Sequence, residues 1–477
     1  MKHIFTVITL FLLLLPEKSF AHPAIERFLS LSYMKGSSVS FMVKDIESGS
    51  VIHSYDAERE VIPASVMKLV TTAVALEVLG ENFRFETAIM YDGQILGNTL
   101  HGNLYIRGSG DPTLGSVEMG RNREKVLQQW IKAIKDAGIR NITGAVIADD
   151  SMFDTEGVSM KWMREDLGSY YGQGCYGLNI FDNCYSLFVN TGEPGSKPAI
   201  DRCVPDIPGL FFRNYLTTAD KDSSYIVGIP YSTERYLYGM VPPNRHDYRL
   251  RGDIPDPPLF LAQYFTQLLN NEEITVAEPH TCYRILSQEE NWQRPERKMI
   301  IATLSPPLKE LVRITNHVSS NLFADAILKS IGLQYRSDEV MSSYGRGIKV
   351  IKEHLESKGI DVSSLWMFDG SGLAATDKMT ASFMCELLTY MSTKSTTFFE
   401  SIPACGIDGT VANFLRGSEL QGKARLKSGS MSRVCSYAGY VTKDNKKYAV
   451  AIIVNNFSCK QAQMKSDIEQ LLIHTLM

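Results

Sequence analysis

Apolar and polar residues alternate in short runs near the N-terminus of the chain. Residues 39–46 and 51–55 predict two β-strands joined by a polar turn. Residues 24–31 have the apolar spacing of a short helix. A longer apolar helical run covers residues 69–79 and stops at Gly80, a residue type that commonly follows the last turn of a helix. The N-terminal part therefore predicts a helix, a hairpin and a second helix.

A similar group of elements returns near the C-terminus. Residues 424–427, 436–442 and 447–454 predict strands, and the last two are separated by Lys443-Asp444-Asn445-Lys446, which is typical of a hairpin turn. Residues 461–476 have helical periodicity. Since strands with adjacent helices occur at both ends, we expect the two ends to share one antiparallel sheet with helices packed on it.

The region between the two ends differs in its pattern of predicted elements. Strand-like and helical stretches alternate there, with proline pairs between them, over residues 83–90, 100–107, 124–137, 144–148, 225–230, 236–241 and 259–269. We interpret this block as one or two inserted β-rich modules. The predicted fold class is α+β, with residues 22–83 and 297–477 forming one discontinuous domain and residues 84–296 forming inserted accessory domains.

Composition, charge and the N-terminal segment indicate which partners and which compartment the protein has. The 477 residues are 44% hydrophobic and 21% charged, as in soluble globular proteins, and a net charge of −4 argues against nucleic acid or an anionic membrane as the main partner. Residues 1–21 combine Lys2 and His3, an apolar run over 4–15 and small residues before His22, as in a signal peptide. A membrane anchor would need a longer apolar span. We expect an exported, soluble protein, with the periplasm as its compartment.

Eight cysteines are scattered over the chain after residue 21. An even number in an exported protein allows disulfides, but the spacing lacks the paired Cys-x-x-Cys of a zinc site. The sequence leaves open which cysteines pair and which are buried thiols. It predicts neither a metal nor a cofactor, and the glycines of Gly108-Ser109-Gly110 are not followed by the lysine of a phosphate-binding loop.

A serine and a lysine stand three residues apart where the apolar helix begins. Ser65 and Lys68 would lie one turn apart on one helix face, within hydrogen-bonding reach. A serine hydroxyl needs an adjacent base to become a nucleophile, and a buried lysine can be that base. The same spacing occurs at Ser32 and Lys35, but that lysine would point into a turn. Ser65 and Lys68 are therefore the candidate nucleophile and base.

Two further patterns follow in the second half of the chain. Ser319-Ser320-Asn321 precedes an apolar helical run over residues 322–331, and Lys427-Ser428-Gly429-Ser430 lies at the end of a predicted strand. Each pattern alone is common, as a helix cap or as a strand leading into a turn. Together with the serine–lysine pair, in this order and in these contexts, they match a known catalytic set.

The chain resembles the low-molecular-mass class C penicillin-binding proteins, the D-alanyl-D-alanine carboxypeptidase/endopeptidase family of serine peptidases. The resemblance covers most of the chain and includes the segments 102–114, 149–153 and Asp369-Gly370-Ser371-Gly372-Leu373. The first two motifs are separated by 319 − 65 = 254 residues, whereas β-lactamases of this fold have a far shorter gap. The resemblance implies a penicillin-binding transpeptidase/β-lactamase-like domain that carries inserted domains.

The resemblance also implies roles for the motif residues. Ser65 is expected to form an acyl-enzyme with the penultimate D-alanine, with Lys68 as base and Ser319 relaying a proton to the leaving amine. The backbone N–H groups of Ser65 and Ser430 are expected to form the oxyanion hole. We also expect a positive charge on Lys427 to help burial keep Lys68 neutral.

The remaining motif residues are expected to bind the substrate. Asn321 would hydrogen-bond the acyl-side amide, and Lys427, Ser428 and Gly429 would hold the terminal carboxylate. The expected partners are peptidoglycan peptides and β-lactam antibiotics. A serine β-lactamase and a non-catalytic penicillin-binding scaffold protein remain as alternatives, and the sequence does not indicate the oligomeric state or the preference between free peptide tails and cross-links.

Overall fold

The computed structural model describes residues 22–120, 123–290 and 292–476. The signal peptide predicted for residues 1–21 lies outside this range. Within the described residues, no helix combines the length and the apolar character needed to cross a bilayer. All eight cysteines are described as unpaired thiols, six of them buried.

Both ends of the chain build one five-stranded antiparallel sheet, as the sequence predicts. Its strand order is β2-β1-β22-β21-β20, with bounds Val51–Tyr55, Ser38–Asp45, Lys446–Asn455, Val434–Lys443 and Ala424–Met431. The turn between β21 and β22 places Asp444 and Asn445 at φ of 50° and 61°, the left-handed conformation that short hairpins require. We call residues 22–83 and 305–476 the terminal body.

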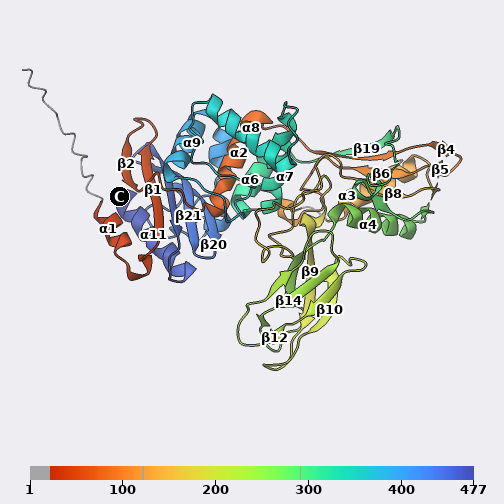
Figure 1. Cartoon of the computed structure of the whole chain (residues 1–477), viewed down its shortest axis with the longest axis horizontal. Helices are drawn as coiled ribbons and strands as arrows, with labels where there is room; N and C mark the ends of the chain where they lie inside the picture. The colour runs from red at the N-terminus through yellow and green to blue at the C-terminus, as the bar shows by residue number, and fades with distance from the viewer. Residues whose placement is uncertain (1–21, 121–122, 291, 477) are drawn as a thin grey trace, which may run out of the picture.

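Helices cover both faces of this sheet (Figure 1). One face packs against α1 (Pro23–Leu29) and α11 (Gln461–Leu476), so the first and last helices lie side by side. The other face packs against a larger apolar cluster of five helices: α2 (Met67–Val78), α6 (Leu308–Val318), α7 (Asn321–Ile331), α8 (Ser343–Ser357) and α9 (Ala381–Lys394). The short α10 (Thr396–Ser401) joins this layer.

The inserted region contains two differently built parts. The first contains a five-stranded sheet of order β18-β8-β6-β3-β19 and a four-stranded sheet of order β17-β7-β5-β4, covered by α3 (Lys125–Asp136) and α4 (Pro257–Asn271). Its strands are β3 (Glu86–Tyr91), β4 (Gln94–Leu96), β5 (Thr99–His101), β6 (Leu104–Arg107), β7 (Asn141–Ile142), β8 (Val146–Asp149), β17 (Thr275–Val276), β18 (Thr281–Cys282) and β19 (Lys298–Leu304). A short helix, α5 (Tyr283–Leu286), follows β18.

The second part consists of strands and protrudes from the rest of the molecule (Figure 1). We call it the β-lobe. Its sheets have the orders β10-β9-β16, β11-β14-β13 and β12-β15. The strands are β9 (Cys184–Asn190), β10 (Ala199–Val204), β11 (Phe211–Asn214), β12 (Thr217–Thr218), β13 (Tyr225–Val227), β14 (Glu234–Tyr238), β15 (Met240–Val241) and β16 (Tyr248–Asp253).

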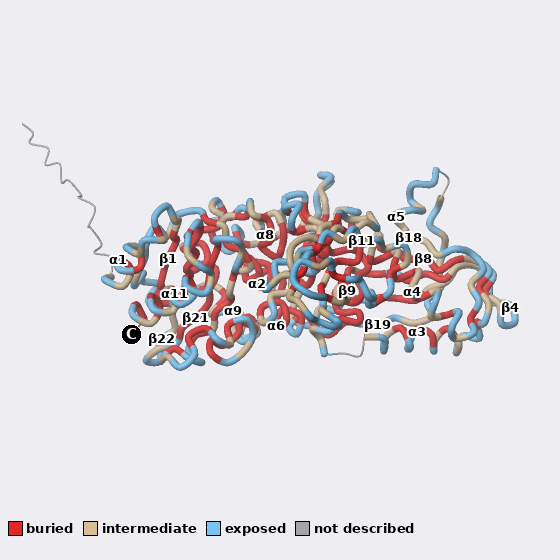
Figure 2. Tube along the Cα trace, turned by 90° about the horizontal axis from the view of Figure 1, so that it is seen from below, coloured by how far each residue is buried: buried red, intermediate tan, exposed pale blue. Residues whose placement is uncertain are grey.

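Strand pairing bears on where the inserted region ends. β19 pairs antiparallel with β3, so residues 298–304 complete a sheet of the insert, although the sequence places the boundary at 297. The domain division stays a prediction, and this pairing favours a return to the terminal body after Leu304. Figure 2 shows buried segments running through the terminal body and the insert, whereas the strand β4 at the far tip is more exposed.

Candidate active site

The predicted serine–lysine pair is held in a turn that leads into α2. Ser65 lies in a 3-10 turn, Ala64–Val66, which continues into the helix at Met67, so the helix begins two residues later than its nucleophile. The Lys68 Nζ donates to Ser65 Oγ over 2.9 Å. Lys68 is fully buried. The structure thus brings the candidate nucleophile and base into direct contact.

Close backbone packing fixes this turn. Ala64 has φ of 50°, and its carbonyl oxygen faces Gly372, where a Cβ would lie only 2.0 Å away. Gly429 of β20 packs equally closely, since a Cβ there would lie 2.2 Å from Ser436 Oγ and 3.0 Å from the Ser65 nitrogen. Two glycines therefore let the chain approach Ser65 from both sides.

The ammonium group of Lys68 has three acceptors in a buried environment. Besides Ser65, it donates to Asn321 Oδ1 and to the Ser371 carbonyl, each over 2.7 Å. Burial lowers the pKa of Lys68 to about 8, although the negative charges of three buried aspartates, Asp325, Asp369 and Asp377, oppose this shift. A lysine with this pKa is partly neutral near pH 7 and can accept a proton.

Asp369 shapes the loop that carries the Ser371 carbonyl. Its Oδ1 accepts from the backbone N–H groups of Ser371 and Gly372 over 3.0 and 2.6 Å. Its Oδ2 accepts from the Ala374 N–H over 2.8 Å and from Trp162 Nε1 over 2.6 Å. Trp162 belongs to the inserted region, so one carboxylate ties the insert to the loop beside Lys68.

The second and third motifs form another lysine–serine pair. Lys427 Nζ donates to Ser319 Oγ over 2.9 Å and to the Ser428 carbonyl over 2.7 Å. Ser319 separates α6 from α7 and has φ of 63°, an uncommon conformation for a residue other than glycine and one often found at functional sites.

The two lysines influence each other differently from the prediction. Burial lowers the pKa of Lys427 well below its ordinary value, and the charge of Lys68 lowers it further. The lowered pKa of Lys68, in contrast, has burial as its cause. Of the two expected causes, burial is therefore confirmed, whereas Lys427 is not among the groups that lower the pKa of Lys68.

The remaining motif residues line the same site. Asn321 Nδ2 donates to the Tyr171 carbonyl over 2.9 Å, so the insert contacts the site a second time. Ser428 Oγ lies 2.7 Å from Thr410 Oγ1. Ser430, one residue beyond Gly429 in β20, accepts through its hydroxyl from Gln461 of α11 over 2.9 Å.

Other residues that match or adjoin the motifs do not take part in the site. Ser320 caps α7 by accepting from the Phe323 N–H over 3.3 Å. Ser32 and Lys35, which share the spacing of the first motif, are both exposed. Sequence reasoning missed four contributors: the carbonyls of Tyr171 and Ser371, the Asp369 carboxylate and the Thr410 hydroxyl.

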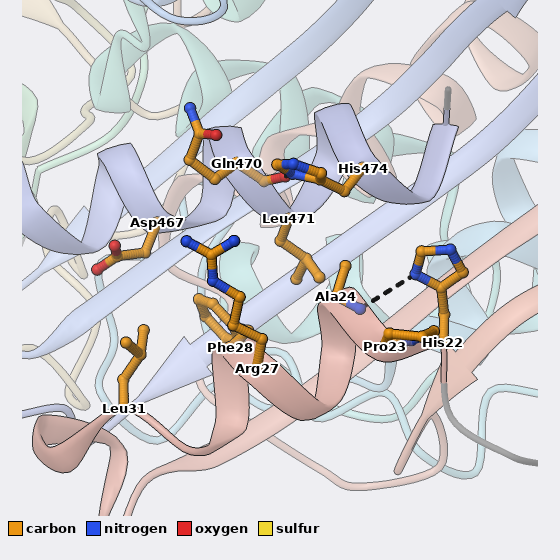
Figure 3. Close-up of a pocket in the computed structure, with 10 residues that line it drawn as sticks. All are labelled: His22, Pro23, Ala24, Arg27, Phe28, Leu31, Asp467, Gln470, Leu471 and His474. Carbon is orange, nitrogen blue, oxygen red and sulfur yellow. Dashed lines mark hydrogen bonds between the residues drawn. The ribbon is translucent and has the colours of Figure 1, made fainter.

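A separate pocket of about 310 Å³ lies between α1 and α11 (Figure 3). Its apolar floor includes Phe28 and Leu471, and its rim includes Arg27, Asp467 and His474. None of the motif residues lines it, and its helices pack on the sheet face opposite to that of α2.

Comparison with known proteins identifies the family of this chain. The profile of the D-Ala-D-Ala carboxypeptidase 3 (S13) family matches residues 22–475. The chain belongs to this family. A D-alanyl-D-alanine carboxypeptidase of Actinomadura sp. (strain R39) is 26% identical over 449 residues, which cover 91% of this chain and 80% of the relative. The carboxypeptidase DacB of Haemophilus influenzae is 25% identical over 443 residues, which cover 91% and 88%.

Solved structures support the fold. Penicillin-binding protein 4 (dacB) of Haemophilus influenzae superposes with a TM-score of 0.79 at 23% identity, covering 92% of this chain and 95% of that chain. This confirms the α+β penicillin-binding fold with an insertion. The family membership confirms the predicted enzyme class, a serine-type D-alanyl-D-alanine carboxypeptidase, over a β-lactamase or a non-catalytic scaffold.

Proposed function

We propose that this protein cleaves the terminal D-alanyl-D-alanine bond of peptidoglycan stem peptides, and the related bond of their cross-links, through an acyl-enzyme on Ser65. One observation carries the proposal. Each of two buried lysines hydrogen-bonds one serine hydroxyl over 2.9 Å, and Asn321 bridges from the second motif to Lys68. The nucleophile and the base are thus in direct contact, and the expected proton relay, Ser319, is in direct contact with Lys427.

The first chemical step forms the ester. Neutral Lys68 removes the proton of Ser65 Oγ as the oxygen attacks the carbonyl carbon of the penultimate D-alanine. Its remaining contacts, to Asn321 and the Ser371 carbonyl, hold the amine in line with the hydroxyl. Burial has already removed the hydration that would keep the amine protonated, so little reorganisation accompanies the transfer.

The tetrahedral intermediate needs donors for its negative oxygen. The backbone N–H groups of Ser65 and Ser430 are assigned this role, and each such donor contributes roughly 3–4 kcal/mol to the transition state. The close packing of Gly429 against the Ser65 nitrogen supports the assignment, because it brings β20 and the helix start together.

Collapse of the intermediate expels an amine, which must gain a proton. Ser319 relays to this amine the proton that Lys68 took from Ser65, so Lys68 is neutral again, and Lys427 holds the Ser319 hydroxyl in place by donating to it. Lys427, Ser428 and Gly429 bind the terminal carboxylate, and this negative charge favours the protonated form of Lys427. The Asn321 amide binds the acyl-side peptide group after exchanging its contact with the Tyr171 carbonyl.

Water then attacks the ester and gives a proton to neutral Lys68, which passes it to Ser65 Oγ as the shortened peptide leaves. A penicillin offers the same kind of carbonyl beside a carboxylate, so it acylates Ser65 and blocks the site. A relative of this fold has been solved as a complex of penicillin-binding protein 4 with a β-lactam, which fits this expectation. The proposed compartment is the periplasm, where the predicted signal peptide would deliver the chain.

The test compares Ser65→Ala with Ser32→Ala, a matched change at the second Ser-x-x-Lys pattern. D-alanine release from a pentapeptide and cleavage of a cross-linked peptide dimer are measured for both variants. We expect Ser65→Ala to abolish both reactions and Ser32→Ala to leave both at the native rate. Release of D-alanine by Ser65→Ala at more than a trace would refute the proposal.

A further inference from the structure

One face of the sheet β11-β14-β13 in the β-lobe is turned inward, as expected for a sheet that covers a core. Alternate residues on this face, Phe212, Arg235, Leu237 and Ile226, point into the lobe, and three of them are buried. Arg235 is paired there with a buried aspartate of β16. By the period of a β-strand, the other face should be polar, because it is turned to solvent.

The solvent face is instead aromatic. It carries five rings, which we call the aromatic platform: Phe211, Tyr215, Tyr225, Tyr236 and Tyr238. The exposed fractions are 51%, 58% and 51% for Phe211, Tyr215 and Tyr225. Clustered exposed rings of this kind are unusual on a soluble surface and mark binding sites.

Four of the rings form a cluster in which each of the others contacts Tyr238. The ring centroid of Tyr238 lies 5.4 Å from that of Tyr215, 5.6 Å from that of Tyr225 and 6.2 Å from that of Tyr236. The interplanar angles of Tyr238 with Tyr215 and Tyr236 are 11° and 9°. Mutual stacking limits the rotation of the rings, so a ligand that packs on them loses little side-chain entropy.

The charges on this face are neutralised within it. Arg213 Nε donates to Glu234 Oε1 over 2.6 Å, and its guanidinium lies 4.6 Å from the centroid of Phe211. The second oxygen of Glu234 accepts from the Tyr236 hydroxyl over 2.8 Å. A face with paired charges and several phenol groups complements an uncharged ligand that has both apolar patches and hydroxyls.

The area of the face also indicates which class of ligand it can bind. Its longest strand has five residues and the sheet has three strands, so the face measures roughly 16 Å by 14 Å, about 230 Å². A stable protein–protein interface needs about 800 Å² from each partner. The area is too small for a protein partner and suits a chain of a few sugar rings.

We propose that the aromatic platform binds the glycan strand of peptidoglycan, with the apolar faces of N-acetylated pyranose rings packed on the tyrosines. The inference rests on the proposed function, because the peptides cleaved at Ser65 are attached to such strands. The β-lobe protrudes where the first part of the insert meets the terminal body, which carries Ser65 (Figure 1). Binding the polymer there holds its peptides near the site and raises their effective concentration.

The test uses peptide-free glycan strands and N-acetylglucosamine hexamers as probes. Binding is measured for the native chain, for the double variant Tyr215→Ser/Tyr225→Ser, and for Tyr55→Ser, which changes an exposed tyrosine of β2 as a control. We expect the native chain and the control to bind both probes. The double variant should lose at least roughly tenfold in affinity, because two stacking rings are removed.

Activity measurements separate this inference from the proposed function. All three proteins should react equally with a penicillin and release D-alanine equally from a soluble pentapeptide, whereas only the double variant should cleave intact peptidoglycan more slowly. Unchanged glycan binding by the double variant would overturn the inference, as would a native chain that binds neither probe. A native dimer that the double variant converts to monomer would assign the platform to a second copy of the chain instead.

Discussion

Two near-isosteric substitutions beside Lys68 should move the pH dependence of acylation in opposite directions. Asp369→Asn removes a negative charge that raises the pKa of Lys68, so the lysine becomes neutral at a lower pH. Asn321→Asp adds a negative charge at a side chain whose Oδ1 lies 2.7 Å from the Lys68 ammonium, so the lysine stays protonated to a higher pH.

The size of the effect follows from the pKa of Lys68 of about 8. The reactive form is the neutral amine, so activity is present above this pKa and is lost as the pH falls through it. About a tenth of the lysine is neutral at pH 7 and about nine tenths at pH 9, which predicts a roughly tenfold rise in the acylation rate. Each unit by which Asn321→Asp raises the pKa costs about a further tenfold at pH 7.

The assay is the second-order rate of labelling by a fluorescent penicillin between pH 6 and 9.5. Dividing each variant's rate by the native rate at the same pH cancels the titration of groups that the substitutions leave alone. Asp369 accepts four hydrogen bonds, so thermal unfolding of both variants is recorded to establish that they are folded. Midpoints that coincide in all three proteins, or that shift in the same direction, would refute the assignment of Lys68 as base.

Three further substitutions test other parts of the structure. Lys427→Met should lower kcat/KM about a hundredfold for a pentapeptide with a free C-terminal carboxylate, and by a smaller factor for the same peptide with a C-terminal amide. Equal losses for the two peptides would contradict the assignment of Lys427 to carboxylate binding. Gly429→Ala places a Cβ 2.2 Å from Ser436 Oγ and should slow penicillin labelling by about a hundredfold; native-like labelling would show that the strand can move away. Arg235→Met leaves the buried carboxylate of Asp253 unpaired and should lower the free energy of unfolding of the β-lobe by about 3–5 kcal/mol, measured by urea denaturation, while an unchanged midpoint would contradict this.

The sequence predicts the terminal body well because its elements have strong local signals. The strands of residues 436–442 and 447–454 and the turn between them are found as β21 and β22, and residues 461–476 form α11. The insert is predicted less completely. Residues 100–107 form two strands, broken at Gly102 and Asn103, and the strands β9, β10, β11 and β16 have no predicted counterpart. The helices predicted over 124–137 and 259–269 are found as α3 and α4.

The contributors that sequence reasoning missed share a physical property. Tyr171 and Ser371 act through backbone carbonyls, which every residue type carries, so no side-chain pattern identifies them. Asp369 acts through a loop whose conformation only the fold defines. Burial of Lys68 was expected as a cause of its lowered pKa, but the depth of burial depends on packing between segments hundreds of residues apart.

The central claim is that Ser65 is the residue that becomes acylated. Intact-mass spectrometry of the full chain after incubation with a penicillin, followed by peptide mapping, tests it most directly. The account predicts one added penicillin per chain, on the peptide that contains Ser65. An adduct on a different residue, or no adduct on a folded chain, would contradict it.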